Sequence, residues 1–216
     1  AKVNENGSLG KTECWYILDC PEGATLVVGH NAKDKEECAK MIHEGRWSEF
    51  IREVPIRKGD FVSIVPGTVH AIKAGVMLLE TQQNSDITYR VYDYDRLSNG
   101  RKRELHIEKS IDVINAPASP AQDSIHNFAN VRKNKPVLME KSAYYKVWKL
   151  VVEDGSELQL SREKDFDSSY LLASVVAGSG YINDTAIKKG DHFIVTNECD
   201  SLSFSGDMEI ILSAQI

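Results

Sequence analysis

Apolar residues recur along this chain in short runs, and most runs show the alternation or the β-branched and aromatic composition typical of strands. In the first half, the predicted strands cover residues 10–18, 24–29, 61–65, 77–79 and 87–96. In the second half, they cover residues 144–152, 157–160, 170–177, 180–182, 192–196 and 208–214. Strands this short and this frequent predict a mainly β protein built as a sandwich or barrel.

Helical patterns are few and short. Asp34 precedes a polar stretch and Glu37 follows it three residues later, which is typical of a capped helix start. We expect this helix to run to about Glu44, because a glycine follows there. A further helical turn is predicted over residues 47–51, and a helix over residues 104–114, where the apolar positions are close to helical spacing.

One stretch organises the first half of the chain. Gly59-Asp60 predicts a tight turn, since glycine tolerates a positive φ and aspartate folds back on its own backbone. The strand over residues 61–65 ends at a second turn, Pro66-Gly67, and His70 begins the next strand. A histidine in this place suits a metal ligand because the backbone aims its ring. The alternative is an ordinary surface or core histidine in a hairpin.

Polar residues of the first strand also share a face. Alternate residues of a strand face the same side, so Lys11, Glu13 and Trp15 point together. Burying the lysine and the glutamate is costly unless they pair. On an exposed face, they would form only a weak ion pair. Both interpretations stay open at this point.

Arg90 lies on the predicted strand over residues 87–96, which is rich in aromatic residues. A guanidinium there can hold an anion through bidentate hydrogen bonds. The alternative is a structural ion pair with a nearby aspartate.

Composition excludes several classes of function. The chain has 216 residues, a net charge of −6 and no basic cluster larger than Arg101-Lys102-Arg103, so we expect no nucleic-acid partner. No run of 18 apolar residues occurs, so we expect no membrane partner. The four cysteines form no CxxC pair, and no signal peptide is apparent. These features predict a reducing, cytoplasmic location.

An internal repeat relates the two halves. Residues 56–62 (IRKGDFV) match residues 187–193 (IKKGDHF). Extending this match without gaps sets His70 opposite Ser201. The second copy therefore keeps the turn and the strand but lacks the candidate ligand.

The repeat and the placement of prolines predict the domain organisation. We expect a first lobe over residues 1–116 and a second lobe over residues 135–216. Between them, residues 117–134 contain two prolines and scattered polar residues, which is typical of a linker.

The spacing Gly59-x6-Pro66-Gly67-x2-His70 resembles the second conserved motif of the cupins, small β-barrels that usually hold a metal inside. It departs from the commoner form, which has one residue between the proline and the glycine. Ala74 stands where that motif often has an asparagine.

A closer resemblance covers essentially the whole chain. The chain resembles the short bacterial form of type I mannose-6-phosphate isomerase in four segments: GKTECW at 10–15, PGTVHA at 66–71, TYRVYD at 88–93 and RELHIE at 103–108. The resemblance implies two cupin-type, jelly-roll β-barrel lobes with a few short helices, of which only the first bears a metal. It also implies a metal-dependent aldose–ketose isomerase that interconverts mannose 6-phosphate and fructose 6-phosphate through a cis-enediol.

The resemblance also implies roles for single residues. The family binds one metal ion, usually Zn²⁺, through a Gln, two His and a Glu. Glu13 matches the ligand Glu, and His70 matches the later ligand His. The family's catalytic arginine matches Arg90. Lys11 and Glu80 fall where the family places active-site polar residues, and either could transfer the proton.

The Gln and the first His of that ligand set belong to a Gln-x-His segment that would lie upstream of the first residue. We therefore expect the N-terminal portion of the first lobe to be absent, or to come as a separate polypeptide. Two protein ligands are too few for a tight zinc site. We accordingly expect this chain alone to bind metal weakly and to be poorly active.

Two other functions remain open. A related cupin that binds sugar without converting it, for example as a regulator, predicts ligand-induced thermal stabilisation with no product. An iron-dependent cupin oxygenase would consume oxygen and would need more histidine ligands than these strands provide.

Overall fold

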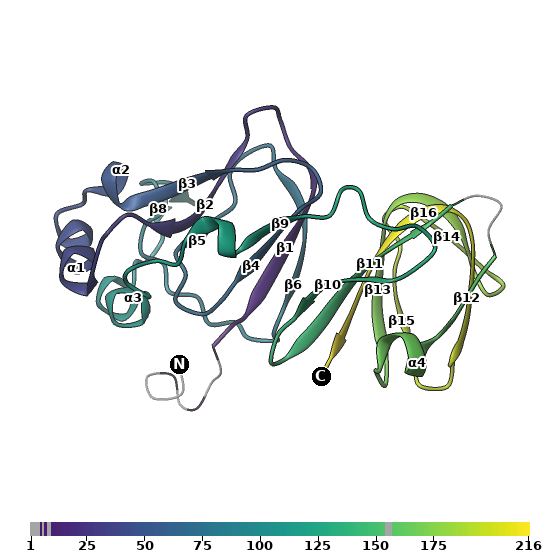
Figure 1. Cartoon of the computed structure of the whole chain (residues 1–216). Coiled ribbons are helices and arrows are strands. Elements are labelled where there is room, and N and C mark those ends of the chain that lie inside the picture. The colour runs from purple at the N-terminus through teal and green to yellow at the C-terminus, as the bar shows by residue number, and fades with distance from the viewer. Residues whose placement is uncertain (1–4, 6, 8–9, 154–156) are drawn as a thin grey trace. The chain divides into compact units, whose positions relative to one another are not determined.

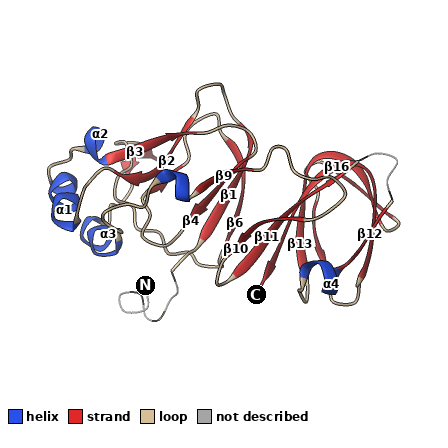
Figure 2. Ribbon diagram, viewed as in Figure 1, coloured by secondary structure: helices blue, strands red, loops and turns tan. Residues whose placement is uncertain are grey.

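The computed structural model describes residues 5, 7, 10–153 and 157–216, and the chain divides into two compact units, Ala1–His126 and Asn127–Ile216 (Figure 1). Both units are built mainly from strands, and their helices are few and short (Figure 2). The prediction of a mainly β protein is confirmed.

The boundary between the units falls inside the segment that was predicted as a linker, residues 117–134. That segment contains a short 3-10 helix, η1 (Ala121–Asp123), and strand β9 (Ile125–Asn127). Strand β9 joins a sheet of the first unit beside β4 (Asp60–Ile64), and the Ser63 amide donates to the Ser124 carbonyl at 2.8 Å.

Two sheets form the first unit. One has the order β6-β1-β4-β9 and the other the order β3-β2-β5. The strands not yet given are β1 (Glu13–Asp19), β2 (Thr25–His30), β3 (Ile51–Pro55), β5 (His70–Ala71) and β6 (Met77–Gln82). A separate pair joins β7 (Leu97–Ser98) to β8 (Arg101–Lys102). Trp15 of β1 and Val28 of β2 belong to one buried cluster, so the two sheets pack against each other.

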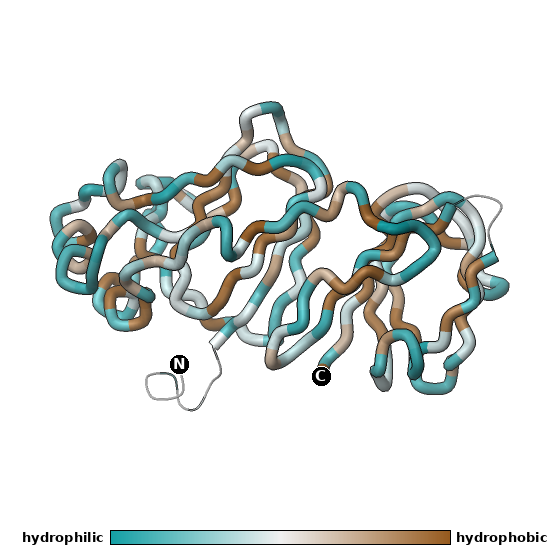
Figure 3. The backbone as a smooth tube through the Cα atoms, viewed as in Figure 1, coloured by the Kyte–Doolittle hydropathy of each residue, from teal (hydrophilic) through white to brown (hydrophobic). Residues whose placement is uncertain are grey.

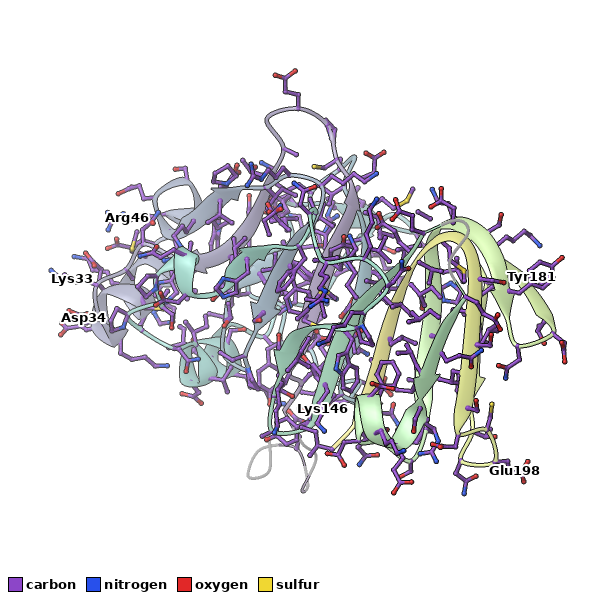
Figure 4. All side chains as sticks on the ribbon, turned by 45° about the vertical axis from the view of Figure 1, so that its right-hand side comes forward. Lys33, Asp34, Arg46, Lys146, Tyr181 and Glu198 are labelled. Carbon is purple, nitrogen blue, oxygen red and sulfur yellow. The ribbon has the colours of Figure 1, made fainter. Side chains whose placement is uncertain are left out.

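The described residues of the first unit form three α-helices: α1 (Lys35–His43), α2 (Trp47–Phe50) and α3 (Ile107–Val113). They gather at one end of its strands (Figure 2). Asp34 caps α1 as predicted, because its Oδ1 accepts from the Glu37 amide at 2.8 Å. Asp34 and Arg46, which lie on either side of α1, are labelled in Figure 4.

Two predicted elements of the first unit differ from the structure. The helix expected over residues 104–114 forms, but it covers only Ile107–Val113, with His106 as its N-cap. The strand expected over residues 87–96 does not form, although aromatic residues of this segment pack against other rings. Tyr92 stacks on Trp47 with ring centroids 4.5 Å apart, and packing of this kind does not require a strand.

The second unit is one sheet with the order β10-β11-β16-β13-β14, and β12 and β15 add to β16 and β13. Its strands are β10 (Val137–Lys141), β11 (Tyr145–Val152), β12 (Leu158–Ser161), β13 (Leu171–Ile182), β14 (Thr185–Lys188), β15 (His192–Val195) and β16 (Ser201–Gln215). One short helix, α4 (Arg162–Phe166), follows β12. The sequence missed β10 and β14 and divided β13 in two. Hydrophobic positions follow the strands of both units in Figure 3.

The internal repeat is visible in the strand register. Tyr16 of β1 pairs with Phe61 of β4, as Ser174 of β13 pairs with His192 of β15. On the other side of each central strand, β1 pairs with β6 and β13 pairs with β16. The register shifts between residues 17 and 19 in the first unit and between residues 175 and 177 in the second, which are equivalent positions. The two units therefore share a three-stranded frame, β6-β1-β4 and β16-β13-β15.

The repeated Gly-Asp turn is also the same in both units. Asp60 Oδ2 accepts from the Arg57 amide at 2.8 Å, and Asp191 Oδ2 accepts from the Lys188 amide at 2.8 Å. Gly59 and Gly190 both have a positive φ, at 88° and 94°, which only glycine adopts readily.

Candidate active site

Glu13 is the centre of a polar cluster at the start of β1. Its side chain is only 1% exposed, so its charge needs partners. The Lys11 ammonium lies 2.6 Å from Glu13 Oε2, and it donates to Gln82 Oε1 at 3.0 Å. Glu80 Oε1 lies 3.8 Å from the same ammonium. The lysine and the glutamate are therefore paired at a buried face, and the interpretation of an exposed ion pair is wrong.

His70 reaches this cluster from the other sheet, because β5 pairs with β2. The turn before His70 packs closely against the backbone that follows residue 112. Gly67 has φ +87°, and a Cβ at that position would lie 2.5 Å from the Val113 carbonyl oxygen. The Asn115 amide donates to the Gly67 carbonyl at 3.0 Å, and Asn115 Nδ2 donates to the Pro66 carbonyl at 2.9 Å. The Pro-Gly pair thus allows the close approach that places the histidine.

The imidazole of His70 faces the carboxylate of Glu13. His70 Nε2 lies 2.7 Å from Glu13 Oε1, and His70 Nδ1 lies 2.8 Å from the Thr68 carbonyl oxygen. A carbonyl oxygen and an ionised carboxylate can only accept, so Nδ1 and Nε2 both carry protons and the ring pairs with Glu13 as an imidazolium. Trp15 packs edge-on against the ring, with centroids 5.4 Å apart. Two residues that lie 57 positions apart in the sequence converge here.

Burial and mutual charge set the ionisation of the cluster. Burial acts to raise the pKa of Glu13, but the interactions with His70 and Lys11 outweigh it and hold that pKa well below its ordinary value. Burial acts to lower the pKa of His70, and the Glu13 carboxylate overcomes this and raises it. Burial and the neighbouring charge of Glu13 both raise the pKa of Glu80. These shifts favour the ionised form of Glu13 and the protonated form of Glu80.

The donor set of this cluster fits a divalent metal ion in its chemistry. A carboxylate oxygen and a neutral imidazole nitrogen are zinc ligands, and ligating histidines usually donate their other N–H to a carbonyl or carboxylate. Glu13 Oε2 is buried and makes an ion-pair contact with Lys11, but no well-aligned hydrogen bond, so lone pairs remain for a cation. Within the described part of the chain, no group of three or more ligand side chains forms. Glu13 and His70 are thus a partial set.

Two side chains of the cluster are partly exposed to solvent. The side chains of His70 and Glu80 are 33% and 34% exposed, whereas Glu13 is almost fully covered. The buried carboxylate therefore lies behind an accessible imidazole and an accessible acid.

Arg90 is not joined to this cluster by any contact within the described residues. Its guanidinium donates from Nη1 to the Glu104 carbonyl at 3.2 Å, and its backbone bonds to His106. Among the described residues, Arg90 forms no ion pair with an aspartate, the alternative that the sequence left open; Asp93 pairs with Arg96 and Arg103 instead. The structure thus brings four of the five candidate residues together and leaves the fifth apart.

Sequence reasoning missed three residues that shape the cluster: Gln82, which binds Lys11, the Thr68 carbonyl, which orients His70, and Trp15 as the packing partner of that ring. Gln82 carried a usable signal, because it lies two residues after Glu80 and so shares its face. The Thr68 carbonyl carried none, since every residue has one.

Comparisons with known proteins decide the family. A family model described as the cupin domain of mannose-6-phosphate isomerase matches residues 138–215. The chain is 43% identical to a mannose-6-phosphate isomerase of Streptococcus mutans, covering 98% of this chain and 66% of that protein. It is 42% identical to ManA, a mannose-6-phosphate isomerase of Bacillus subtilis, covering 99% of this chain and 67% of that protein. This chain belongs to the mannose-6-phosphate isomerase family.

Solved structures agree with the fold. A crystal structure of the mannose 6-phosphate isomerase from Bacillus subtilis matches 99% of this chain and 67% of its own, with a TM-score of 0.79 and 37% identity. A putative mannosephosphate isomerase from Archaeoglobus fulgidus matches with a TM-score of 0.73 at 14% identity, which shows likeness of fold alone. The expected cupin-type fold is confirmed.

The chain spans about two thirds of the length of the relatives that it matches. In the described residues, no helix combines the length and the apolar character that crossing a bilayer requires.

Proposed function

We propose that the complete protein interconverts mannose 6-phosphate and fructose 6-phosphate. The observation that carries this proposal is the buried Glu13 carboxylate facing His70, with Lys11 and Glu80 beside it, in a chain 43% identical to a protein named mannose-6-phosphate isomerase. The reaction moves a proton between C2 and C1 of the sugar and needs a stabilised cis-enediol, so it requires acid–base groups next to a source of positive charge.

We propose that Glu13 and His70 would hold one Zn²⁺ ion, for which their donor atoms are suited. When bound, such an ion polarises the carbonyl and hydroxyl oxygens of a sugar as a Lewis acid. The remaining ligands are proposed to lie in the third of the relatives' length that this chain does not match. They would be supplied by the same polypeptide or by a separate one. This chain alone is then expected to bind metal weakly.

Lys11 and Glu80 are the proposed proton-transfer residues. A base takes the C2 proton, the released electron pair forms the C1=C2 bond of the enediol, and the carbonyl oxygen gains a proton. Return of a proton to C1 with loss of the O2 proton then forms the ketone. Glu80 suits such a shuttle because burial and the charge of Glu13 raise its pKa above the ordinary value of a glutamate. Lys11 keeps Glu13 ionised at the same time.

Arg90 is the proposed cation for the substrate. One nitrogen of its guanidinium is used by the Glu104 carbonyl. The remaining N–H groups have no protein acceptor among the described residues, so they can bind the phosphate or the developing enediolate charge.

The test is a coupled assay for conversion of mannose 6-phosphate to fructose 6-phosphate with the full-length protein after Zn²⁺ loading. Turnover that is lost with a chelator and restored by Zn²⁺ is the expected result. Absence of turnover, together with thermal stabilisation by the sugar phosphate, would show instead the non-catalytic sugar-binding protein. Oxygen consumption would show an oxygenase. A cytoplasmic location remains a prediction, and fractionation of cells checks it.

A further inference from the structure

Arg90 lies in a segment without regular structure. Strand β6 ends at Gln82 and β7 begins at Leu97, and the described residues between them form neither helix nor strand. The other four candidate residues lie on strands or within two residues of one. The backbone of Arg90 is not fixed by a strand or a helix. Its guanidinium is therefore placed only by the contacts that Arg90 makes with neighbouring residues.

His106 provides two such contacts. The Arg90 N–H donates to His106 Nδ1 at 3.1 Å, and the His106 N–H donates to the Arg90 carbonyl at 2.8 Å. One residue thereby satisfies both backbone polar groups of Arg90. The bond from the guanidinium goes to Glu104, two residues before His106, so the same short stretch also holds the arginine side chain.

His106 is itself held by helix α3. It is the N-cap of this helix, and its carbonyl accepts from the Ser110 amide at 2.8 Å. Its ring lies 6.0 Å from the Tyr89 ring, centroid to centroid. Tyr89 and Lys109 both donate to Glu5 Oε1, at 2.8 and 2.7 Å. The acceptor for the Arg90 amide is therefore attached to a packed helix.

We propose that His106 is a positioning residue that holds Arg90 in place for the substrate, an inference that rests on the proposed function. The ring must accept at Nδ1, so it serves in the neutral form with its proton on Nε2. Alanine removes this acceptor. Asparagine keeps one, because its Oδ1 occupies a δ position like the Nδ1 of histidine.

The experiment compares His106→Ala and His106→Asn in the full-length, Zn²⁺-loaded protein. His106→Ala is expected to lower kcat/KM by roughly 10- to 100-fold, chiefly through kcat, because a misplaced charge costs most in the transition state. It is also expected to speed hydrogen exchange of the Arg90 amide by about tenfold or more. His106→Asn is expected to return both quantities to within about threefold of wild type, since the acceptor is kept.

His43→Ala is the matched control. His43 also bonds to helix α3, with its Nε2 2.9 Å from Glu108 Oε1, but it makes no contact with Arg90 among the described residues. Loss of this histidine is expected to leave both the kinetics and the Arg90 exchange unchanged.

Unchanged kinetics and exchange in His106→Ala would overturn the inference, as would His106→Asn behaving like His106→Ala. If His106→Ala does not fold, His106→Gln replaces it. The glutamine acceptor lies one bond farther out, so this variant should be impaired where asparagine is not. An inactive wild type would overturn the proposed function, whereas the exchange measurement would still judge the role of His106.

Discussion

The two units share a three-stranded frame, but the side chains on that frame are polar in the first unit and apolar in the second. In the first, β1 runs between β6 and β4, and in the second β13 runs between β16 and β15. Trp15 pairs with Glu80 in the first frame, and the equivalent pair in the second is Ala173 with Leu212. By the same register, Leu171 takes the place of Glu13. A polar cluster in one unit thus corresponds to an apolar core in the other.

Burial is nearly the same at the Glu13 and Leu171 positions, so the chemistry of the side chain rather than its burial separates them. Leu171 and Leu212 are both 0% exposed and belong to the main core of the second unit. Glu13 is 1% exposed, and ion pairs with Lys11 and His70 stabilise its charge. Apolar side chains at these positions stabilise by removing area from water, whereas charged ones are retained at a cost that their partners offset. The contrast indicates that the first unit keeps its charges for a function.

The largest expected effect comes from making the first frame resemble the second, with Glu13→Leu. Turnover by the full-length protein should fall by more than about 100-fold, since even loss of a group that only supports a ligand costs roughly 10- to 100-fold. The free energy of unfolding of the metal-free protein should stay within about 1 kcal/mol of wild type, because the leucine fills the buried volume, Lys11 keeps its contacts with Gln82 and Glu80, and His70 is partly exposed and can lose its charge. The coupled assay and urea denaturation measure the two. A large loss of stability would show that Glu13 is mainly structural.

The reverse change, Leu171→Glu, tests the second frame. A carboxylate there has none of the partners that Glu13 has, so unfolding free energy should fall by at least about 3 kcal/mol. Urea denaturation checks this, with Leu171→Met as the control for altered packing alone. A stable Leu171→Glu protein would mean that the second unit can also accommodate buried charge, and would weaken the contrast.

The shared turn should show a smaller difference. Asp60→Ala and Asp191→Ala each remove the acceptor for a backbone amide, which costs about 1–3 kcal/mol for a charged acceptor. Asp60 is buried and Asp191 is partly exposed, so the loss should be larger for Asp60→Ala. Equilibrium denaturation compares them, and Asp→Asn at each position keeps the acceptor as the control. Equal losses would show that burial does not matter at this turn.

The smallest effect concerns pH. Since folding lowers the pKa of Glu13, its contribution to stability is present above about pH 4.3, the unfolded value, and is lost as pH falls through the folded value. The raised pKa of His70 acts in the opposite sense, because its contribution is present below about pH 6.5 and is lost as pH rises through the folded value. The raised pKa of Glu80 likewise reduces stability as pH rises.

The unfolding free energy of the metal-free protein should therefore decline on the acid side by on the order of 1 kcal/mol more in wild type than in Glu13→Leu. Urea denaturation at a series of pH values measures this difference. Parallel pH profiles for the two proteins would show that the ion pair does not persist in solution.

Local patterns in the sequence were enough for the mainly β class, the capped helix after Asp34, the Gly59-Asp60 turn and its copy at Gly190-Asp191. Each depends on neighbouring residues, whose preferences act over a few positions. The same kind of reasoning failed over residues 87–96, because alternation there reflects contacts with Trp47 and the core of the unit, which only the packed chain provides.

The contact between Glu13 and His70 could be predicted from the sequence only in part. The resemblance to the isomerase family implied a shared cation, but the approach of the two side chains to 2.7 Å depends on two sheets packing face to face. The orientation of the His70 ring depends on the Thr68 carbonyl, and the Arg90 carbonyl is held by the backbone N–H of His106; folding brings both of these backbone groups near. Every residue carries such groups, so the chain alone determined which side chains were available, and only the tertiary structure decided which backbone atoms orient them.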